Sequence, residues 1–228
     1  MPYVRSTLVV ISLLVAGRAG AQASDPASYL IADRAAEIAM ARSAGPKAIA
    51  DSATILVLTK TGFVEAVPGT NGFTCFVGRS FDSAFNDPNF WNPANRGPEC
   101  LNPPAVKSVL REMLKRAEWV MAGASKDEIQ KRDRDGYAAH TLPMPAPGAM
   151  AYMLSPDQAL ASGNSHWVPH VMFWFDKSHA PALGLSDANT TMLDGTATDP
   201  DAPFLLLLIP VRKWSDGKLA MPEGAHTR

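Results

Sequence analysis

Two cysteines constrain this chain more strongly than any other feature of its sequence. Cys75 and Cys100 are the only cysteines among 228 residues, and the second lies near the end of an aperiodic segment, residues 80–102, that is rich in Asn, Pro and aromatic residues. A disulfide between them would tie the end of this segment to the strand expected at residues 73–77, and it would stabilise the fold by about 3 kcal/mol. The sequence therefore predicts that the long segment is a cross-linked loop.

The N-terminus indicates an environment in which such a bond can persist. Arg5 precedes an apolar run at residues 8–16, and a segment of small residues with an A-x-A motif follows. This order is typical of a secretory signal peptide, because so short a run rises only about 14 Å as a helix, against a membrane core of roughly 30 Å. We expect residues 1–23 to be a signal peptide and residues 24–228 to form a single globular domain. The product would be periplasmic or secreted, where disulfides are stable.

The composition excludes several other classes of protein. Hydrophobic residues make up 46% of the chain, charged residues make up 19%, and the formal net charge is −1. A chain so apolar and so nearly neutral is neither disordered nor suited to nucleic acid, which binds through clustered positive charge. No run after residue 23 reaches the roughly 18 apolar residues of a membrane span. We therefore expect a small molecule or an envelope protein as partner, with no nucleic acid, no membrane span in the mature chain and no cofactor.

Hydrophobic periodicity and turn residues divide the mature chain into groups of helices and strands. Helices are expected at residues 25–45, 103–123 and 125–135, and strands at residues 53–59, 63–67, 73–77, 149–154, 168–175 and 204–211. Asn71-Gly72 predicts a type I′ hairpin turn before the third strand. The last strand is apolar on both faces, which predicts a central position with cover on each side. Residues 186–203 are polar and acidic, and we expect them to form a solvated loop.

The order of these elements, helix, three strands, two helices and three strands, indicates the fold class. Short turns within each strand group favour antiparallel neighbours. We therefore predict an α+β fold with a single, largely antiparallel sheet of about six strands and helices packed on it. The element order resembles that of profilin-like and sensor-type folds. Residues 147–154, together with the strand near Pro169, also resemble exported bacterial proteins, and this resemblance implies no activity.

The strand at residues 168–175 carries the strongest candidate binding surface. Its alternation places His170, Met172 and Trp174 on one face, which is part polar and part apolar. Ligand pockets are mostly apolar with a few placed polar groups. With Tyr152 from the preceding strand, these residues predict a ligand-binding site. The first hypothesis is therefore a non-enzymatic domain that binds a small molecule or a protein partner.

Two other functions remain open for the protein. In an unfamiliar periplasmic hydrolase, His170 would act as the general base, oriented by Asp82, Asp87 or Glu99 from the long loop. A structural envelope component would have no pocket at all. The sequence lacks the common nucleotide-binding, zinc-protease and serine-hydrolase motifs, so no catalytic residue is assigned.

Soft metal binding is a third alternative. His170 and Met172, with Met150 or Met153 from the neighbouring strand, offer the nitrogen and sulfur ligands that copper accepts. The sequence contains no compact set of ligands with the spacing of a structural metal site. It therefore predicts no metal site.

Overall fold

The fold is known from a computed structural model, which describes residues 25–160, 168–184, 193–194 and 203–220. The signal peptide expected at residues 1–23 lies outside this described part of the chain. Most of the acidic loop expected at residues 186–203 also lies outside it.

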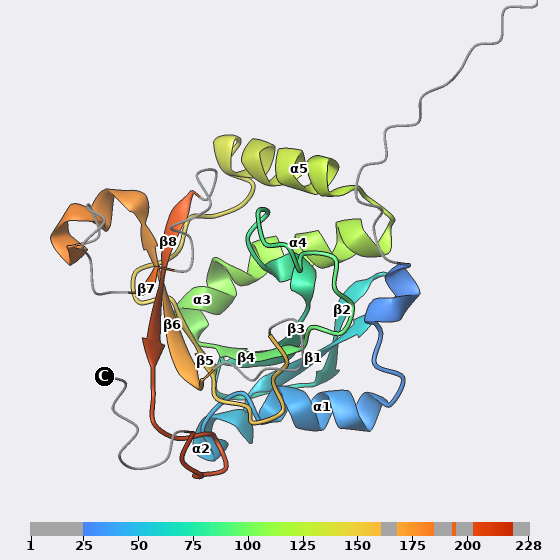
Figure 1. Ribbon diagram of the computed structural model, residues 1–228, viewed down its shortest axis with the longest axis vertical. Helices are drawn as coiled ribbons and strands as arrows, with labels where there is room; N and C mark the ends of the chain where they lie inside the picture. Colours follow the sequence, from blue (N-terminus) through green and yellow to red (C-terminus); the bar gives the residue numbers. More distant parts are fainter. Residues whose placement is uncertain (1–24, 161–167, 185–192, 195–202, 221–228) are drawn as a thin grey trace, which may run out of the picture.

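Eight strands and five α-helices make up the described fold (Figure 1). The strands are β1 (Thr54–Thr59), β2 (Gly62–Val67), β3 (Thr74–Gly78), β4 (Gly97–Leu101), β5 (Met150–Met153), β6 (His170–Asp176), β7 (Leu193–Asp194) and β8 (Phe204–Pro210). The α-helices are α1 (Arg34–Arg42), α2 (Lys47–Ala50), α3 (Pro103–Lys107), α4 (Leu110–Met121) and α5 (Lys126–Ala138). Short 3-10 turns are η1 (Pro26–Tyr29), η2 (Ser80–Asp82), η3 (Lys177–His179) and η4 (Pro181–Leu183).

The strands form one sheet in the order β2-β1-β3-β4-β5-β6-β8-β7. The β1–β3 pair is parallel, and every other neighbouring pair is antiparallel. The predicted α+β class with a largely antiparallel sheet is therefore confirmed, although the sheet has more strands than expected. The additional strands are β4 and β7. Gly97 and Pro98 at the start of β4 have low strand propensity, which is why the sequence pattern concealed it.

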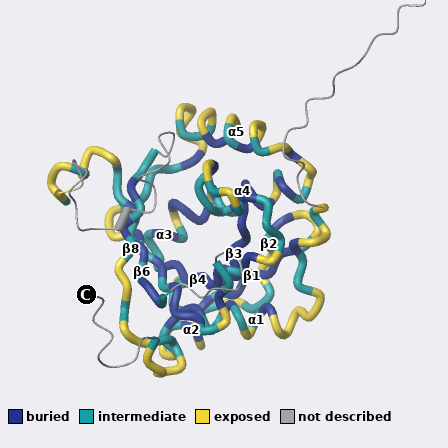
Figure 2. Tube along the Cα trace, in the orientation of Figure 1, coloured by how far each residue is buried: buried dark blue, intermediate teal, exposed yellow. Residues whose placement is uncertain are grey.

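Helices cover both faces of the sheet (Figure 1). On one face, Ala41 of α1 packs with Ile55, Cys75 and Val77. On the other face, the residues next in sequence to these strand residues contact α3 and α4 in a second core cluster that includes Leu56, Phe76, Leu101, Ala105 and Leu110. Because side chains alternate along a strand, the same strands contribute residues to the core on both faces of the sheet. The strands β3 and β4 are buried along their whole length, whereas α5 exposes its outer side (Figure 2).

The predicted disulfide between Cys75 and Cys100 is present. The two residues face each other directly on β3 and β4, and both are fully buried beneath α1. The end of the long segment is therefore itself a strand, held to β3 by a covalent bond as well as by the ladder. Within the described residues, no helix is both long enough and apolar enough to cross a membrane.

The structure divides two of the expected helices. The first is replaced by η1 and α1, because Asp33 caps a new helix by accepting hydrogen bonds from the N–H groups of Ala35 and Ala36. The second breaks into α3 and α4 at Ser108. The third begins at the expected capping box but continues through Gly136, where a Cβ would lie 2.8 Å from Leu142.

The predicted hairpin at Asn71-Gly72 is wrong. A type I′ turn needs positive φ at both central residues, and here Gly72 has it at 76° whereas Asn71 does not. Instead, the Asn71 side chain donates to the Ile49 carbonyl oxygen at 2.8 Å and accepts from the Phe73 N–H at 3.0 Å. These bonds carry the chain past the start of β1, so that β3 becomes the parallel neighbour of β1 on the side away from β2.

The predicted central position of the last strand is also wrong. β8 lies next to the edge strand β7. Leu205 and Leu207 are buried on one face, and the intervening residues of the opposite face are only half-buried. That second apolar face lines a cavity, which explains why the strand is apolar on both sides.

Replacing both cysteines with alanine is expected to lower the free energy of unfolding by about 3 kcal/mol, because the cross-link restricts the unfolded chain. Urea denaturation followed by tryptophan fluorescence measures this change. Dithiothreitol should destabilise the oxidised wild type by the same amount and leave the double variant unaffected. Coincident unfolding curves for the oxidised wild type and the variant would contradict this account.

Candidate functional site

A cavity of about 890 Å³ lies between the sheet and helices α4 and α5. Its floor is the face of β4, β5, β6 and β8 that also packs against α4, and the loop after β3 forms another wall. Most small-molecule sites have volumes of roughly 300–1,000 Å³ and mainly apolar walls. The apolar lining includes Val109, Met113, Met153, Leu160, Met172, Trp174, Phe204, Leu206 and Leu208.

Three of the four predicted site residues line this cavity. His170, Met172 and Trp174 alternate along β6, and their exposed fractions are 1%, 6% and 3%. Tyr152, the fourth predicted residue, does not line the cavity. It pairs with Val171 and packs in the cluster beneath α1, on the opposite face of the sheet. Met153, one residue later, is the β5 residue that lies beside His170, so the prediction erred by one residue of register.

Among the described residues, a backbone carbonyl oxygen rather than one of the proposed acids lies beside the His170 Nδ1. This Nδ1 lies 2.9 Å from the Val168 carbonyl oxygen, the position that an orienting carboxylate takes in a hydrolytic triad. Burial lowers the pKa of the imidazole. Glu99 lies on β4, two strands away and thus roughly 10 Å across the sheet. Asp82 and Asp87 instead accept hydrogen bonds from main-chain N–H groups within their own loop.

The residues proposed for soft metal binding are only partly brought together. Met153 and Met172 share the cavity face with His170, whereas Met150 pairs with Phe173 on the other face. Within the described ranges, no group of three or more His, Cys, Asp or Glu side chains could hold a metal ion.

A pair of carboxyl groups, Glu99 and Asp82, lies at the β3–β4 end of the cavity. Glu99 is only 4% exposed, and Asp82 is half-buried with its Oδ1 out of contact with solvent. Both approach Gly78, where a Cβ would lie 2.9 Å from Glu99 Oε1 and 3.5 Å from Asp82 Oδ2. Gly78 pairs with Gly97 across the strands. Gly78 therefore leaves the space that the two carboxyl groups occupy, whereas a Cβ at Gly97 would meet Leu160 and Met153.

Burial makes both carboxyl groups unusually weak acids. It raises the pKa of Asp82 to about 7, although the hydrogen bond from the Arg79 N–H and the charges of Arg116 and Arg79 favour the ionised form. It also raises the pKa of Glu99 well above its ordinary value, and the neighbouring charge of Asp82 adds to this rise. Interacting carboxyl groups lose their protons as a pair. The pair therefore holds at least one proton near neutral pH.

Several buried polar atoms of the cavity wall have no hydrogen-bond partner among the described residues. They are Ser80 Oγ, Asp82 Oδ1, Glu99 Oε2 and Asp133 Oδ1. Folded proteins satisfy nearly all such atoms. These residues line the cavity, so a bound molecule could satisfy such atoms once the side chains turn toward it. Ser80 and Asp82 belong to η2, and Glu99 belongs to β4.

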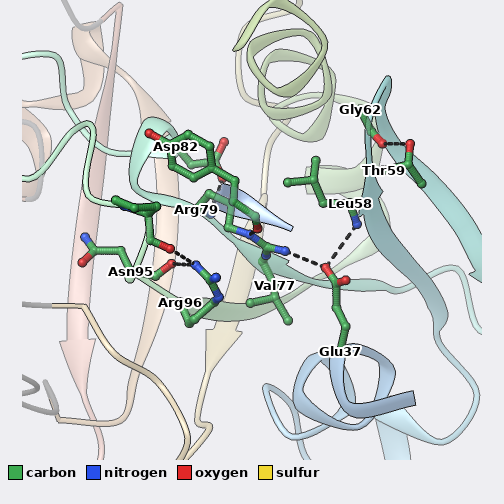
Figure 3. Close-up of polar contacts among 11 residues, drawn as sticks. Glu37, Leu58, Thr59, Gly62, Val77, Arg79, Asp82, Asn95 and Arg96 are labelled. Carbon is green, nitrogen blue, oxygen red and sulfur yellow. Dashed lines mark hydrogen bonds and ion pairs between the residues drawn. The ribbon is translucent and has the colours of Figure 1, made fainter. Parts of the chain in front are cut away.

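Arg79 fixes the loop that carries Asp82. Figure 3 shows its guanidinium directed at Glu37 of α1, with an Nη2 to Oε1 distance of 2.8 Å. The same side chain donates to the carbonyl oxygens of Tyr29 and Val77, and its main-chain N–H donates to Asp82 Oδ2 at 2.8 Å. The arginine is thus fully engaged, and it links α1 to the acidic end of the cavity.

A second arginine organises the helical wall. Arg116 of α4 contacts Glu112 Oε1 and Asp133 Oδ2, each at 2.6 Å, and donates to the Ser83 carbonyl oxygen at 3.0 Å. The hydroxyl of Tyr137 donates to Glu112. This network joins α4, α5 and the loop after β3. Its burial raises the pKa of the Asp133 carboxyl to about 7 despite the adjacent guanidinium.

Sequence reasoning missed the pairing of Glu99 with Asp82. Both residues lie in the segment expected to be an aperiodic loop, and Glu99 was considered only as a partner for His170. Gly78, four residues before Asp82, was the available indication that the backbone approaches other groups closely at this point.

No protein-family model matches the chain, and comparisons with curated proteins and with solved structures found no match. A fold alone does not determine function. The cavity and the groups that line it are therefore the basis for assigning one.

Glu37→Gln is expected to lower the free energy of unfolding by about 3–5 kcal/mol, because it leaves the buried Arg79 guanidinium without its charged partner. Urea denaturation measures the loss. Asp51→Asn, which breaks the exposed Lys47–Asp51 pair, is the matched control, and its effect should stay within about 0.5 kcal/mol. Equal effects of the two substitutions would show that the buried pair is not a structural link.

Asp82→Asn should alter how stability depends on pH. A carboxyl with a raised folded-state pKa keeps its proton between about pH 4 and pH 7 while the unfolded chain has lost it, so its stabilisation is lost as the pH rises through this range. Relative to Asp82→Asn, the wild type should lose up to about 1.4 kcal/mol per pH unit, levelling off above the folded-state pKa. Chemical denaturation from pH 5 to pH 8 measures the difference, and parallel profiles would contradict it.

Proposed function

We propose that this protein binds a small, largely apolar molecule in the cavity between the sheet and helices α4 and α5. The observation that carries the proposal is the combination of a cavity of about 890 Å³, apolar side chains on its floor and unpartnered polar atoms at one end. Apolar walls provide affinity through burial, and a few placed polar groups provide orientation. A purely structural component would gain nothing from such an opening.

A small molecule fits the surface better than a protein partner does. The large apolar residues exposed in the described chain are Val64, Ile209 and Leu219. Val64 lies on β2, at one edge of the sheet, whereas Ile209 lies on β8 near the other edge. Docking surfaces are contiguous apolar patches, and residues at opposite ends of a sheet do not form one.

Binding also fits the chemistry better than hydrolysis does. The His170 Nδ1 faces a backbone carbonyl oxygen, and Glu99 lies two strands away from it across the sheet. The disulfide supports a periplasmic or secreted location, because such bonds persist in oxidising compartments. We therefore favour a non-enzymatic binding protein of the cell envelope or the medium.

The uncharged dye Nile red tests whether the cavity accepts an apolar molecule. We expect its fluorescence to rise on addition of the protein. Leu208→Trp should weaken binding by about tenfold or more, because the indole would fill space beside Met172. Ile209→Trp is the matched control, since Ile209 is the next residue on β8, is 44% exposed and lies on the other face.

Two results would count against the proposal. One is the absence of any dye binding to the folded wild type. The other is equal binding by Leu208→Trp and the wild type, which would place the dye elsewhere on the surface. Near-identical circular dichroism spectra of the two tryptophan variants would establish that the comparison is between folded proteins.

A further inference from the structure

Some ionisable side chains of the cavity wall form ion pairs, and others do not. Arg79 is held by Glu37 and two carbonyl oxygens, and Arg116 is held by Glu112 and Asp133. In the described chain, no salt bridge reaches Glu99 or Asp82. At the β3–β4 end of the cavity, the ionisable side chains without a salt bridge among the described residues are therefore the two acids.

The acidic end presents acceptors in an arrangement suited to one kind of donor. Glu99 Oε2 and Ser80 Oγ belong to side chains that are 4% and 2% exposed, and neither atom has a partner among the described residues. Asp82 Oδ1 is also unpartnered and inaccessible. An alkylammonium group has three N–H donors and no acceptor. Glu99, Asp82 and Ser80 all line the cavity, and their side-chain oxygens would match that set once turned toward a bound ammonium group.

The cavity lining is acidic at the β3–β4 end and becomes apolar toward β8. Glu99 pairs with Phe76 on one side, and the β4–β5 register places it beside Met153, which in turn lies beside His170. Beyond His170, the floor is formed by Met172, Trp174 and the apolar face of β8. A molecule lying across the strands would thus meet carboxyl groups at one end and apolar side chains along the rest.

We infer that the cavity selects molecules with an ammonium group attached to an apolar body, and that Glu99 and Asp82 bind the ammonium group. This inference rests on the proposed function and specifies its ligand class. Charge-assisted hydrogen bonds in a site shielded from water are stronger than those between neutral groups. A buried cation needs a buried anion beside it, and here the anion is provided by the carboxyl pair.

Binding of a cation would displace a proton from the pair. Without a ligand, the pair retains a proton near neutral pH, because burial disfavours two charges. An ammonium ion stabilises the ionised form, so the proton passes to solvent as the cation binds. The other charged or titratable groups that line the cavity are Arg79, Asp87, Glu112, Arg116, Asp133, Arg134, Tyr137 and His170.

Three probes with the same alkyl chain separate charge from apolar burial: octylammonium, 1-octanol and octanoate. Isothermal titration calorimetry or displacement of Nile red at pH 8 gives the dissociation constant of each. Octylammonium should bind the wild type about tenfold or more tightly than either of the others. Glu99→Gln should remove this preference while leaving 1-octanol binding within about twofold.

Glu65→Gln is the matched control, because it makes the same substitution at an exposed position on β2, outside the cavity. It should retain the full preference for octylammonium. Nile red binding by Glu99→Gln establishes that the variant keeps its cavity. A second readout needs no variant: calorimetry of the wild type at pH 7 in phosphate and in Tris should show proton release with octylammonium and none with 1-octanol.

The outcomes distinguish this inference from the proposal on which it rests. Equal binding of octylammonium and 1-octanol, or tighter binding of octanoate, would overturn the ammonium site and leave small-molecule binding intact. A preference that survives Glu99→Gln would overturn the assigned residues. Failure of all three probes and of Nile red would instead overturn the proposed function itself.

Discussion

The buried Arg79–Glu37 ion pair is the contact on which the arrangement of the cavity depends. Arg79 follows β3 directly, and its side chain reaches α1 while its main chain holds Asp82. A guanidinium with so little exposure is tolerated because it bonds the Glu37 carboxylate and two carbonyl oxygens. The segment after β3 is therefore fixed at its first residue. From that fixed point it runs over the cavity and reaches Arg116 through the Ser83 carbonyl oxygen.

Two features of the strands then determine the shape of the interior. The paired glycines, Gly78 and Gly97, make room for neighbouring side chains: the two carboxyl groups at Gly78, and Leu160 and Met153 at Gly97. At the other end, the cavity-facing side chains of β8 are only half-buried, although Phe204 packs edge-on against Tyr137 of α5. Buried carboxyl groups and unfilled volume both cost stability in the free protein. Such costs are expected where a ligand completes the structure.

Sequence reasoning succeeded wherever a local pattern determined the outcome. The α+β class followed from the periodicities, the Cys75–Cys100 bond followed from the cysteine count and the expected export, and the shared face of His170, Met172 and Trp174 followed from strand alternation. It failed where strand pairing between distant parts of the chain determined which face a residue occupies. Tyr152 was placed on the wrong face because the β5–β6 register is set by tertiary packing, which a single strand does not reveal.

The acidic pair could not be predicted for the same reason. Glu99 meets Asp82 only because a Gly-Pro sequence, which disfavours strands by propensity, is held in β4 by its ladder and its disulfide. The Asn71-Gly72 turn likewise has the composition of a hairpin, yet the bonds of its asparagine to Ile49 and Phe73 direct the chain across β1. In each case a tertiary contact overrode a local preference.

The central claim is that an ammonium group and its apolar chain occupy this cavity together. A crystal structure of the protein grown with octylammonium tests it most directly. The account predicts the nitrogen within hydrogen-bonding distance of Glu99 and Asp82, roughly 2.7–3.2 Å, with the alkyl chain extending toward Trp174 and β8. A cavity closed by its own side chains, or an alkyl chain bound with its nitrogen away from both carboxyl groups, would contradict the claim.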